Sequence, residues 1–342
     1  MSDTVVERHA KTAAGWRSVS GDIKLAAVLF ALLALVPAVI GGYAVYILPQ
    51  YLLFGVLAMS LGLLWGLGGI VSFGQAAFFA IGGYSMGLAM QAGFGPAGAY
   101  LGLICAALAG AVLAGLAGYF LFSAGVRATY FVLVTLALSI IVEQAAVSQS
   151  QLTGGWNGMF VDRMSLNFGP LGEISLYEDA AAYYFILPIV ALIFFGLRAL
   201  SVSRFGKILV GIRENEDRMM ALGYSVSFYK TLAFSLSGAL AGFAGALYAT
   251  HANFVSPSLA GVLFSTEVVV WVAIGGRTSL LGALLGGVAV SALSNYLSSV
   301  TPEYWQLVLG IIFVLVILFF KEGLAGLARS LADRLHRTRA DG

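Results

Sequence analysis

The stretch LAAVLFALLALVPAVIGGYAVY, residues 25–46, is 22 residues long and carries no charged side chain. A helix that crosses the roughly 30 Å hydrocarbon core of a bilayer needs about 20 consecutive, mainly apolar residues. The stretch meets this requirement. It is too long for a cleavable signal peptide and lacks a small-residue cleavage site. We therefore expect a transmembrane helix here.

The rest of the chain has the same character. Of its 342 residues, 60% are hydrophobic and 10% are charged, against about 25% charged residues in an ordinary globular chain. Two long segments are almost free of charge: residues 25–148 hold only Arg127 and Glu143, and residues 231–320 hold only Glu267, Arg277 and Glu303. In lipid, every backbone polar group needs a partner within the protein, so only helices and closed barrels cross a membrane. The composition excludes soluble, disordered, nucleic-acid-binding and disulfide-scaffold classes.

The apolar runs have the length of helices and not the short alternation of a barrel, which predicts an all-α polytopic membrane protein. Ten crossings are expected, at residues 25–46, 51–70, 75–90, 95–122, 130–148, 183–200, 232–252, 263–274, 280–297 and 305–320. The sequence Leu48-Pro49-Gln50 is expected to separate the first two. The short, glycine-interrupted third segment fits either a spanning or a partly re-entrant helix.

Basic residues orient these helices, because lysine and arginine accumulate in short cytoplasmic loops. Fifteen of the 18 lie in three clusters: Arg8, Lys11, Arg17 and Lys24; Arg198, Arg204, Lys207, Arg213, Arg218 and Lys230; and Lys321, Arg329, Arg334, Arg337 and Arg339. If all three clusters are cytoplasmic, an even number of helices must separate each cluster from the next. Six of the expected helices lie between the first and second clusters, and four lie between the second and third. The expected division is a cytoplasmic tail at 1–24, a transmembrane domain at 25–320 with a periplasmic loop at 149–181 and a cytoplasmic segment at 201–230, and a cytoplasmic amphipathic tail at 321–342. Both termini then face the cytoplasm of a bacterial cell, and the protein lies in the inner membrane.

Glycine is abundant, with 43 residues. Pairs spaced four apart, such as Gly238 and Gly242, are typical of tight contacts between membrane helices. Ionisable and amide groups at membrane depth are costly and usually face a bundle interior or a wet cavity. They fit two interpretations equally, which are interhelical hydrogen bonds and the lining of a substrate path. The candidates for such a path are Gln75, Glu143, Glu267 and Asn295.

Catalytic motifs are missing from the sequence. It has no phosphate-binding loop of the G-x-x-x-x-G-K-[ST] type and no G-x-S-x-G nucleophile elbow, and its three histidines are scattered. We therefore expect no enzymatic activity, no metal site and no cofactor bound by this chain.

The segment SRFGKILVGIRENEDRMMALGYSVSFYK, residues 203–230, interrupts the apolar pattern. Apolar residues recur at helical spacing from Arg204 to Leu222, which predicts one amphipathic helix, and Gly223 is placed to end it. Its mixed charge favours a protein partner over a bilayer surface.

Together with the helix that follows, this segment resembles the cytoplasmic coupling region of bacterial ABC importer permeases of the branched-chain amino acid family, which also includes urea and short-amide importers. Three further stretches are similar to that family: GLGGIVSFGQAAFFAIGGYSMGL at 66–88, LTGGWNGM at 152–159 and EVVVWVAIGGRTSLLGALLGG at 267–287. The ten helices match the type II importer permease fold. Family members commonly have histidine where this chain has Gln75.

The resemblance implies a permease subunit of an ATP-driven importer of branched-chain amino acids. Its partners would be a second permease subunit, two ABC ATPase subunits that bind ATP and Mg²⁺, and a periplasmic substrate-binding protein. It implies coupling to the ATPase by Arg204, Phe205, Gly206, Arg213, Glu214, Asn215, Glu216, Ala221 and Gly223. The implied docking site for the binding protein is Thr153, Gly154, Gly155 and Asn157.

Other functions stay open at this point. The same architecture could import urea or short amides. A proton-coupled secondary transporter working through Glu143 and Glu267, with broken helices at the glycine-rich third and eighth segments, is the alternative of another class. An intramembrane scaffold or enzyme is disfavoured by the lack of catalytic residues.

Overall fold

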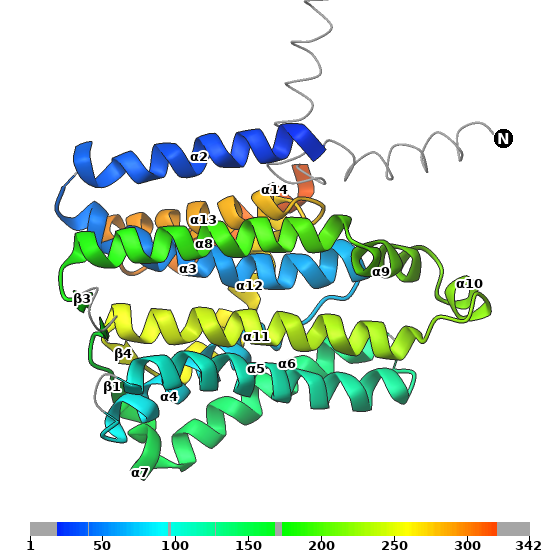
Figure 1. Cartoon of the computed structure of the whole chain (residues 1–342), viewed down its shortest axis with the longest axis horizontal. Coiled ribbons are helices and arrows are strands. Elements are labelled where there is room, and N and C mark those ends of the chain that lie inside the picture. The colour runs from blue at the N-terminus through cyan, green and yellow to red at the C-terminus, as the bar shows by residue number, and fades with distance from the viewer. Residues whose placement is uncertain (1–18, 40, 95–96, 127, 168–172, 320–342) are drawn as a thin grey trace, which may run out of the picture.

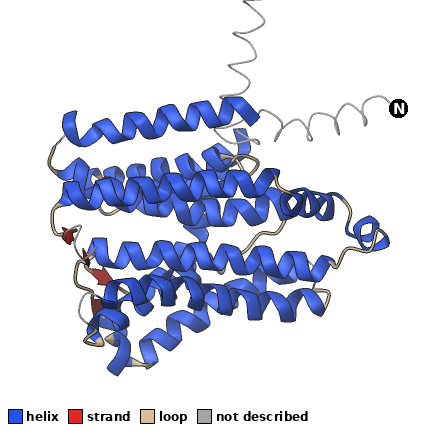
Figure 2. Ribbon diagram, in the orientation of Figure 1, coloured by secondary structure: helices blue, strands red, loops and turns tan. Residues whose placement is uncertain are grey.

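The computed structural model describes residues 19–39, 41–94, 97–126, 128–167 and 173–319. Long helices lie side by side along the longest axis of the molecule (Figure 1). The short helices α9 and α10 lie at one end of this bundle, and α7 with the short strands lies at the other (Figures 1 and 2). We call these the α10 end and the α7 end. Most of the tail predicted at 1–24 lies outside the described residues. The whole tail predicted at 321–342 also lies outside them.

The predicted all-α membrane fold is confirmed, and the prediction of about ten crossings is roughly consistent with ten helices of 14 or more residues in the described part of the chain. They are α2 (Val19–Val39), α3 (Tyr43–Leu63), α4 (Gln75–Gln91), α5 (Ala97–Ser123), α6 (Ala128–Ser148), α8 (Asp179–Val202), α11 (Val226–Ala252), α12 (Val262–Gly275), α13 (Leu280–Val300) and α14 (Trp305–Phe319). A π-helical turn, η1 (Leu64–Gly68), extends α3. Within the described residues, six helices are long and apolar enough to cross a membrane. Parts of α2 and α14 and the whole of α12 form shorter apolar helices.

The connecting segments occupy the two ends. At the α7 end lie α7 (Ser150–Thr153), η2 (Gly155–Asn157), β1 (Met159–Phe160), β2 (Ser165–Asn167), β3 (Glu173–Ser175), β4 (Phe254–Val255) and η4 (Pro257–Ala260). At the α10 end lie α9 (Arg204–Glu214) and α10 (Glu216–Ala221). Strand β1 pairs antiparallel with β4, so that Met159 lies opposite Val255, and β2 pairs antiparallel with β3.

The predicted boundary between the first two helices was wrong. The chain turns after Val39, and α3 begins at Tyr43 with Pro49 buried inside it. The turn uses Gly42, whose φ of 70° is a backbone conformation that glycine adopts without steric cost. Proline is tolerated inside membrane helices because neighbouring groups satisfy the freed carbonyl. The boundary between the two helices therefore lies at Gly41 and Gly42 and not at Pro49.

Small residues allow α11 to pack at the centre of the bundle against α4 and α5. A Cβ atom on Gly238 would overlap the backbone of Gly110, and one on Gly242 would overlap the carbonyl of Ala106. One on Gly245 would overlap the carbonyl of Phe79. The interpretation of the glycine pairs as tight helix contacts is confirmed for α11.

Helix α4 begins inside the bundle. Its first residue, Gln75, is hydrogen-bonded to Ser60 in α3. The α3–η1 helix continues for eight residues beyond Ser60, which is about 12 Å at 1.5 Å per residue. Residues 69–74, which we call the α3–α4 connection, therefore run back into the bundle before α4 starts. This agrees with the re-entrant alternative for the third segment.

Candidate functional site

The charged segment between α8 and α11 forms two helices. They are separated at Asn215, whose backbone is extended, with φ −162° and ψ 104°. The Asn215 side chain accepts a hydrogen bond of 2.8 Å from the N–H of Arg218 and so caps α10. The prediction of one helix from Arg204 to Leu222 was wrong, because asparagine favours a helix cap over a helix interior.

The end of α10 agrees with the prediction. The N–H of Gly223 donates to the carbonyl of Met220, and the N–H of Tyr224 donates to that of Met219. These two bonds end the helix at Gly223. The residues around the turn are exposed, with 53% of Met220, 66% of Leu222 and 60% of Phe228 accessible.

The sequence did not single out these three residues as a contact surface. Met220 and Leu222 are two positions apart and Phe228 belongs to the next helix, so no helical periodicity marks them as one face. The predicted coupling residues Ala221 and Gly223 lie among them and are also exposed.

The first turn of α9 is packed tightly onto the end of α8. The hydroxyl of Ser203 accepts a hydrogen bond from the N–H of Gly206. A Cβ atom at Gly206 would overlap the carbonyl oxygens of Leu200 and Ser201. The Phe205 ring lies 5.9 Å from that of Tyr229 in α11. Of the three residues predicted here, only Arg204 is exposed.

The last turn of α9 is attached to η1 through Arg213. The guanidinium Nη1 donates to the carbonyl of Gly66 at 2.5 Å, and Nη2 pairs with Glu214 at 2.8 Å. The Arg213 side chain is only 22% exposed, and a Cβ atom on Gly69 would lie 2.7 Å from its Cγ. The predicted coupling residue Arg213 therefore points into the bundle, where it holds the π-helical turn.

Helix α10 is attached to α11 by an ion pair. Glu216 accepts from the Lys230 ammonium at 2.5 Å, with side-chain exposures of 52% and 13%. The ammonium also lies 5.6 Å from the ring centroid of Phe122 in α5. Both α9 and α10 thus contact the membrane helices directly.

The amide of Gln75 is completely enclosed. The Ser60 hydroxyl donates to its oxygen at 3.1 Å, and its nitrogen donates to Ser237 at 3.1 Å. Ser237 in turn donates to the carbonyl of Ser60 at 2.6 Å. This closed network joins α3, α4 and α11, and Gln75 is 1% exposed. In this conformation Gln75 forms interhelical hydrogen bonds.

Two hydroxyl groups one turn apart on α6, those of Thr135 and Ser139, hold the α3–α4 connection in place. Thr135 accepts from the N–H of Phe73 at 3.1 Å, and Ser139 donates to the carbonyl of Phe73 at 2.8 Å. Ser265 in α12 donates to Ser139 at 3.1 Å. These buried hydroxyls satisfy a backbone that has no helical partners.

The two membrane-depth carboxylates lie on neighbouring helices. Glu143 is on α6 and Glu267 on α12, which contact each other, and both side chains are partly exposed. The Glu143 carboxylate lies beside Gly261, where a Cβ atom would come within 3.2 Å of it. Asn295, on α13, donates to the Tyr43 hydroxyl at 3.1 Å. The structure therefore places Glu143 and Glu267 on adjacent helices, whereas Gln75 contacts α3 and α11.

The predicted docking loop forms a compact turn. The buried hydroxyl of Thr153 donates to the carbonyl of Ala146 at 2.5 Å, and Gly155 is also buried. Gly154 and Asn157 are exposed. The turn also exposes 73% of Trp156 and, after it, 80% of Phe160. Neither aromatic residue was predicted to be a contact, although a tryptophan within the Gly-Gly-Trp-Asn-Gly sequence of a predicted loop was a usable sign.

Arg163 stabilises the loop behind this turn. It donates to Asn253 at 3.0 Å and pairs with Asp179 at 3.1 Å. It also donates to the carbonyl of Tyr177. Together with the pairing of β1 and β4, these contacts fix the loop to α8 and α11.

Comparisons with known proteins identify the family to which the chain belongs. The model of a family described as "Branched-chain amino acid transport system / permease component" matches residues 43–317. The high-affinity branched-chain amino acid transport system permease protein LivM of Salmonella typhimurium is 30% identical over 318 residues, which cover 86% of this chain and 72% of that protein. Its Escherichia coli namesake is 28% identical over 92% of this chain and 81% of its own length.

A more distant relative is named for the transport of a different class of compound. The nucleoside ABC transporter permease protein NupC of Lactococcus lactis is 28% identical over 64% of this chain and 70% of its own length. No solved structure matches the chain at a comparable level.

Proposed function

We propose a role in ATP-driven import of branched-chain amino acids for this chain, which belongs to the branched-chain amino acid transport system permease family. It is a multi-pass membrane protein and a transport permease subunit, not an enzyme. The substrate proposal is supported by the names of the two relatives that cover most of the chain. Urea, short amides and nucleosides are the competing substrates.

The proposed complex contains a second permease subunit, two ATPase subunits that bind ATP and Mg²⁺, and a periplasmic substrate-binding protein. The α10 end faces the cytoplasm in this proposal. The basic residues of α9 and α10 support that orientation, since Arg204, Lys207 and Arg218 are exposed there. Both termini then lie in the cytoplasm of a bacterial cell, and the α7 end lies in the periplasm.

The observation that carries the mechanism is the hydrogen bond from Arg213 to the carbonyl of Gly66. The exposed residues Met220, Leu222 and Phe228 would contact the ATPase, which moves when ATP binds. Movement of α10 and α9 would pull η1 through Arg213. Because η1 leads directly into the α3–α4 connection, the start of α4 would move with it. Access to the path would change by such a shift of packed helices.

The path itself is proposed on the face formed by α6 and α12. A carboxylate at membrane depth is costly against lipid and usually faces a protein interior or a wet cavity. The face formed by α6 and α12 has two such carboxylates, those of Glu143 and Glu267. The exposed face of α5 instead carries apolar residues such as Leu108, Val112 and Leu116. We therefore propose that α6 and α12 face the second permease subunit and that α5 faces lipid.

The binding protein is proposed to dock at the α7 end. Trp156 and Phe160 would be the central contacts, because exposed aromatic residues contribute strongly at protein interfaces. Of the residues predicted from sequence, Gly154 and Asn157 would contact the partner. Thr153 and Gly155 would shape the turn from inside.

A transport assay in proteoliposomes tests this function. The complete complex should take up labelled leucine only when ATP is present on the ATPase side and the binding protein is on the other side. Uptake should continue when the proton gradient is collapsed. Uptake that needs the proton gradient and not ATP would contradict the proposal in favour of a secondary transporter, and uptake of urea without leucine would contradict the substrate.

A further inference from the structure

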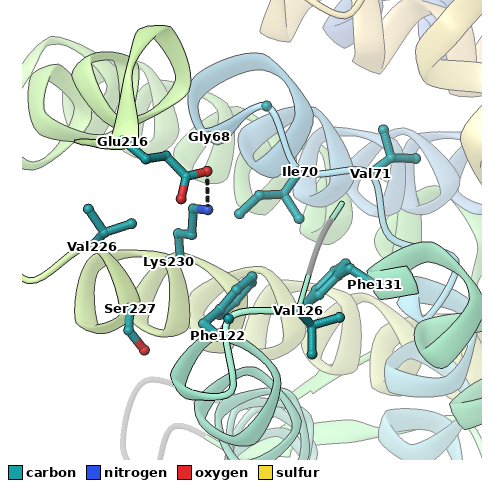
Figure 3. A pocket seen from close by; sticks show the side chains of 12 residues that line it. Gly68, Ile70, Val71, Phe122, Val126, Phe131, Glu216, Val226, Ser227 and Lys230 are labelled. Carbon is teal, nitrogen blue, oxygen red and sulfur yellow. Dashed lines mark hydrogen bonds and ion pairs between the residues drawn. The ribbon is translucent and has the colours of Figure 1, made fainter. Parts of the chain in front are cut away.

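A cavity of about 330 Å³ lies beneath α10 at the α10 end. This volume is at the lower end of the range of about 300–1,000 Å³ typical of small-molecule sites. Its walls come from three parts of the chain: the residues around the α3–α4 connection, the loop between α5 and α6, and the α10–α11 pair (Figure 3).

The described part of the cavity wall carries one charge of each sign. Among the residues that the structure describes, Glu216 and Lys230 are the charged side chains that line the cavity, and they form the 2.5 Å ion pair described above. A ligand with a net charge would leave one wall charge poorly compensated. A neutral or zwitterionic ligand would not, and a zwitterion can gain from both charges.

Besides the ion pair, the described wall contains the Ser227 hydroxyl, glycine backbone and several apolar side chains. Ile70, Val126 and Phe131 lie across the cavity from the ion pair, and Phe122 lies below it in the view of Figure 3. These side chains suit a branched aliphatic group, which would be buried there at a gain of roughly 0.8 kcal/mol per CH₂ group. One end of the cavity is thus ionic and the other aliphatic.

We infer that this cavity is an inhibitory site for a zwitterionic aliphatic amino acid, entered from the cytoplasmic side. The ligand carboxylate would bind the Lys230 ammonium, which has three N–H groups and gives one to Glu216. The ligand ammonium would bind the Glu216 carboxylate. Both charged groups of an α-amino acid are attached to one carbon atom, so a single molecule matches an ion pair whose members are in contact.

The position of the cavity gives the ligand a regulatory effect. A bound amino acid would join α10, α11 and the α3–α4 connection in the arrangement seen here. These are the segments that the proposed function, on which this inference rests, requires to move. The imported product would therefore slow its own import when it accumulates in the cytoplasm.

The test uses the complete importer in proteoliposomes, with ATP and unlabelled leucine in the lumen on the ATPase side. Labelled leucine and the binding protein are outside. Luminal leucine at about ten times its dissociation constant should lower uptake about tenfold, because one site in eleven stays empty. Leucinamide, which lacks the carboxylate, and 4-methylpentanoate, which lacks the ammonium, should not inhibit.

A cavity-filling variant localises the effect. Val126→Phe should keep uptake close to that of the wild type without luminal leucine, and it should abolish the inhibition. Val112→Phe places the same bulk on an α5 position that is 57% exposed, and it should remain as inhibited as the wild type. The ligand series on the wild-type complex provides an independent measurement if Val126→Phe does not assemble.

Three results would overturn the inference: normal uptake that luminal leucine does not slow, equal inhibition by leucinamide or 4-methylpentanoate, or a Val126→Phe complex inhibited as strongly as the wild type. Absence of leucine uptake without luminal leucine is a distinct result and would overturn the proposed function itself.

Discussion

The guanidinium of Arg213 in α9 donates a hydrogen bond to the carbonyl of Gly66 in η1, across 147 positions of sequence. A π-helical turn leaves its carbonyls in a less regular arrangement than an α-helix does, and such turns are frequent at functional sites. A hydrogen bond to a charged group contributes about 1.5–3 kcal/mol. An energy of that size can change a two-state equilibrium by roughly 10- to 150-fold.

Gly69 should be sensitive to the smallest substitution. Its φ of 68° is left-handed, and a Cβ atom would press on the Arg213 side chain. Gly69→Ala should cost about 1–2 kcal/mol through the backbone alone and should displace Arg213. We expect a lower ratio of leucine imported to ATP hydrolysed. Gly196→Ala on α8, where the added atom meets nothing within 4 Å, is the control and should leave the ratio unchanged.

Replacement of Gln75 by leucine should destabilise the protein. The change removes both hydrogen bonds to the amide, and the hydroxyls of Ser60 and Ser237 keep their bonds to the carbonyls of Leu57 and Ser60. Each hydrogen bond that is lost contributes about 0.5–1.5 kcal/mol to stability. Thermal unfolding in detergent should show a lower midpoint for Gln75→Leu than for Gln75→His, since histidine can still donate and accept. Equal midpoints for the wild type and Gln75→Leu would contradict the closed network.

Gly242→Ala should disturb the centre of the bundle. The new methyl group would overlap the carbonyl of Ala106 in α5, which belongs to backbone and cannot turn away. Overpacking of this kind costs about 1–3 kcal/mol. We expect a lower yield of folded protein by size-exclusion chromatography, whereas Gly196→Ala, at an exposed position of α8, should behave like the wild type. A fully stable Gly242→Ala protein would show that α11 packs less closely than described.

Trp156→Ala should weaken docking of the binding protein. Loss of a central aromatic contact often costs 2 kcal/mol or more, which corresponds to an affinity roughly 30-fold lower. Binding of the purified binding protein to the complex in nanodiscs measures it. Leu192→Ala changes a residue that is 74% exposed on the side of α8 and should have no effect. An unchanged affinity for the Trp156→Ala complex would place the docking surface elsewhere.

The number of helices could be predicted because it depends on the length of apolar runs, and lipid imposes that length on every crossing. The turn at Gly42 could not be placed in the same way. Its position depends on which residue adopts a positive φ, and Pro49 offered a stronger but misleading break. The split at Asn215 was missed for a similar reason, since apolar periodicity continues on both sides of the cap.

The site was less predictable than the fold. A charged residue on an amphipathic segment is expected to face water, and nothing in the letters around Arg213 shows that its partner is a backbone carbonyl in η1. Gln75 was singled out from the sequence as an amide within an apolar segment, and the structure buries it. Its partners Ser60 and Ser237 are ordinary serines far along the chain, so only the packing of α3, α4 and α11 identifies the network.

The ratio of leucine imported to ATP hydrolysed in Arg213 variants tests the account most directly, measured in proteoliposomes that hold equal amounts of assembled complex. Arg213→Met keeps the apolar stem and removes the hydrogen bond, so ATP hydrolysis should continue while the ratio falls about tenfold or more. Arg213→Lys retains a charge and a hydrogen-bond donor, so its ratio of leucine imported to ATP hydrolysed should lie between those of the wild type and Arg213→Met. An unchanged ratio for Arg213→Met would contradict the claim that α9 acts on the membrane helices through Gly66.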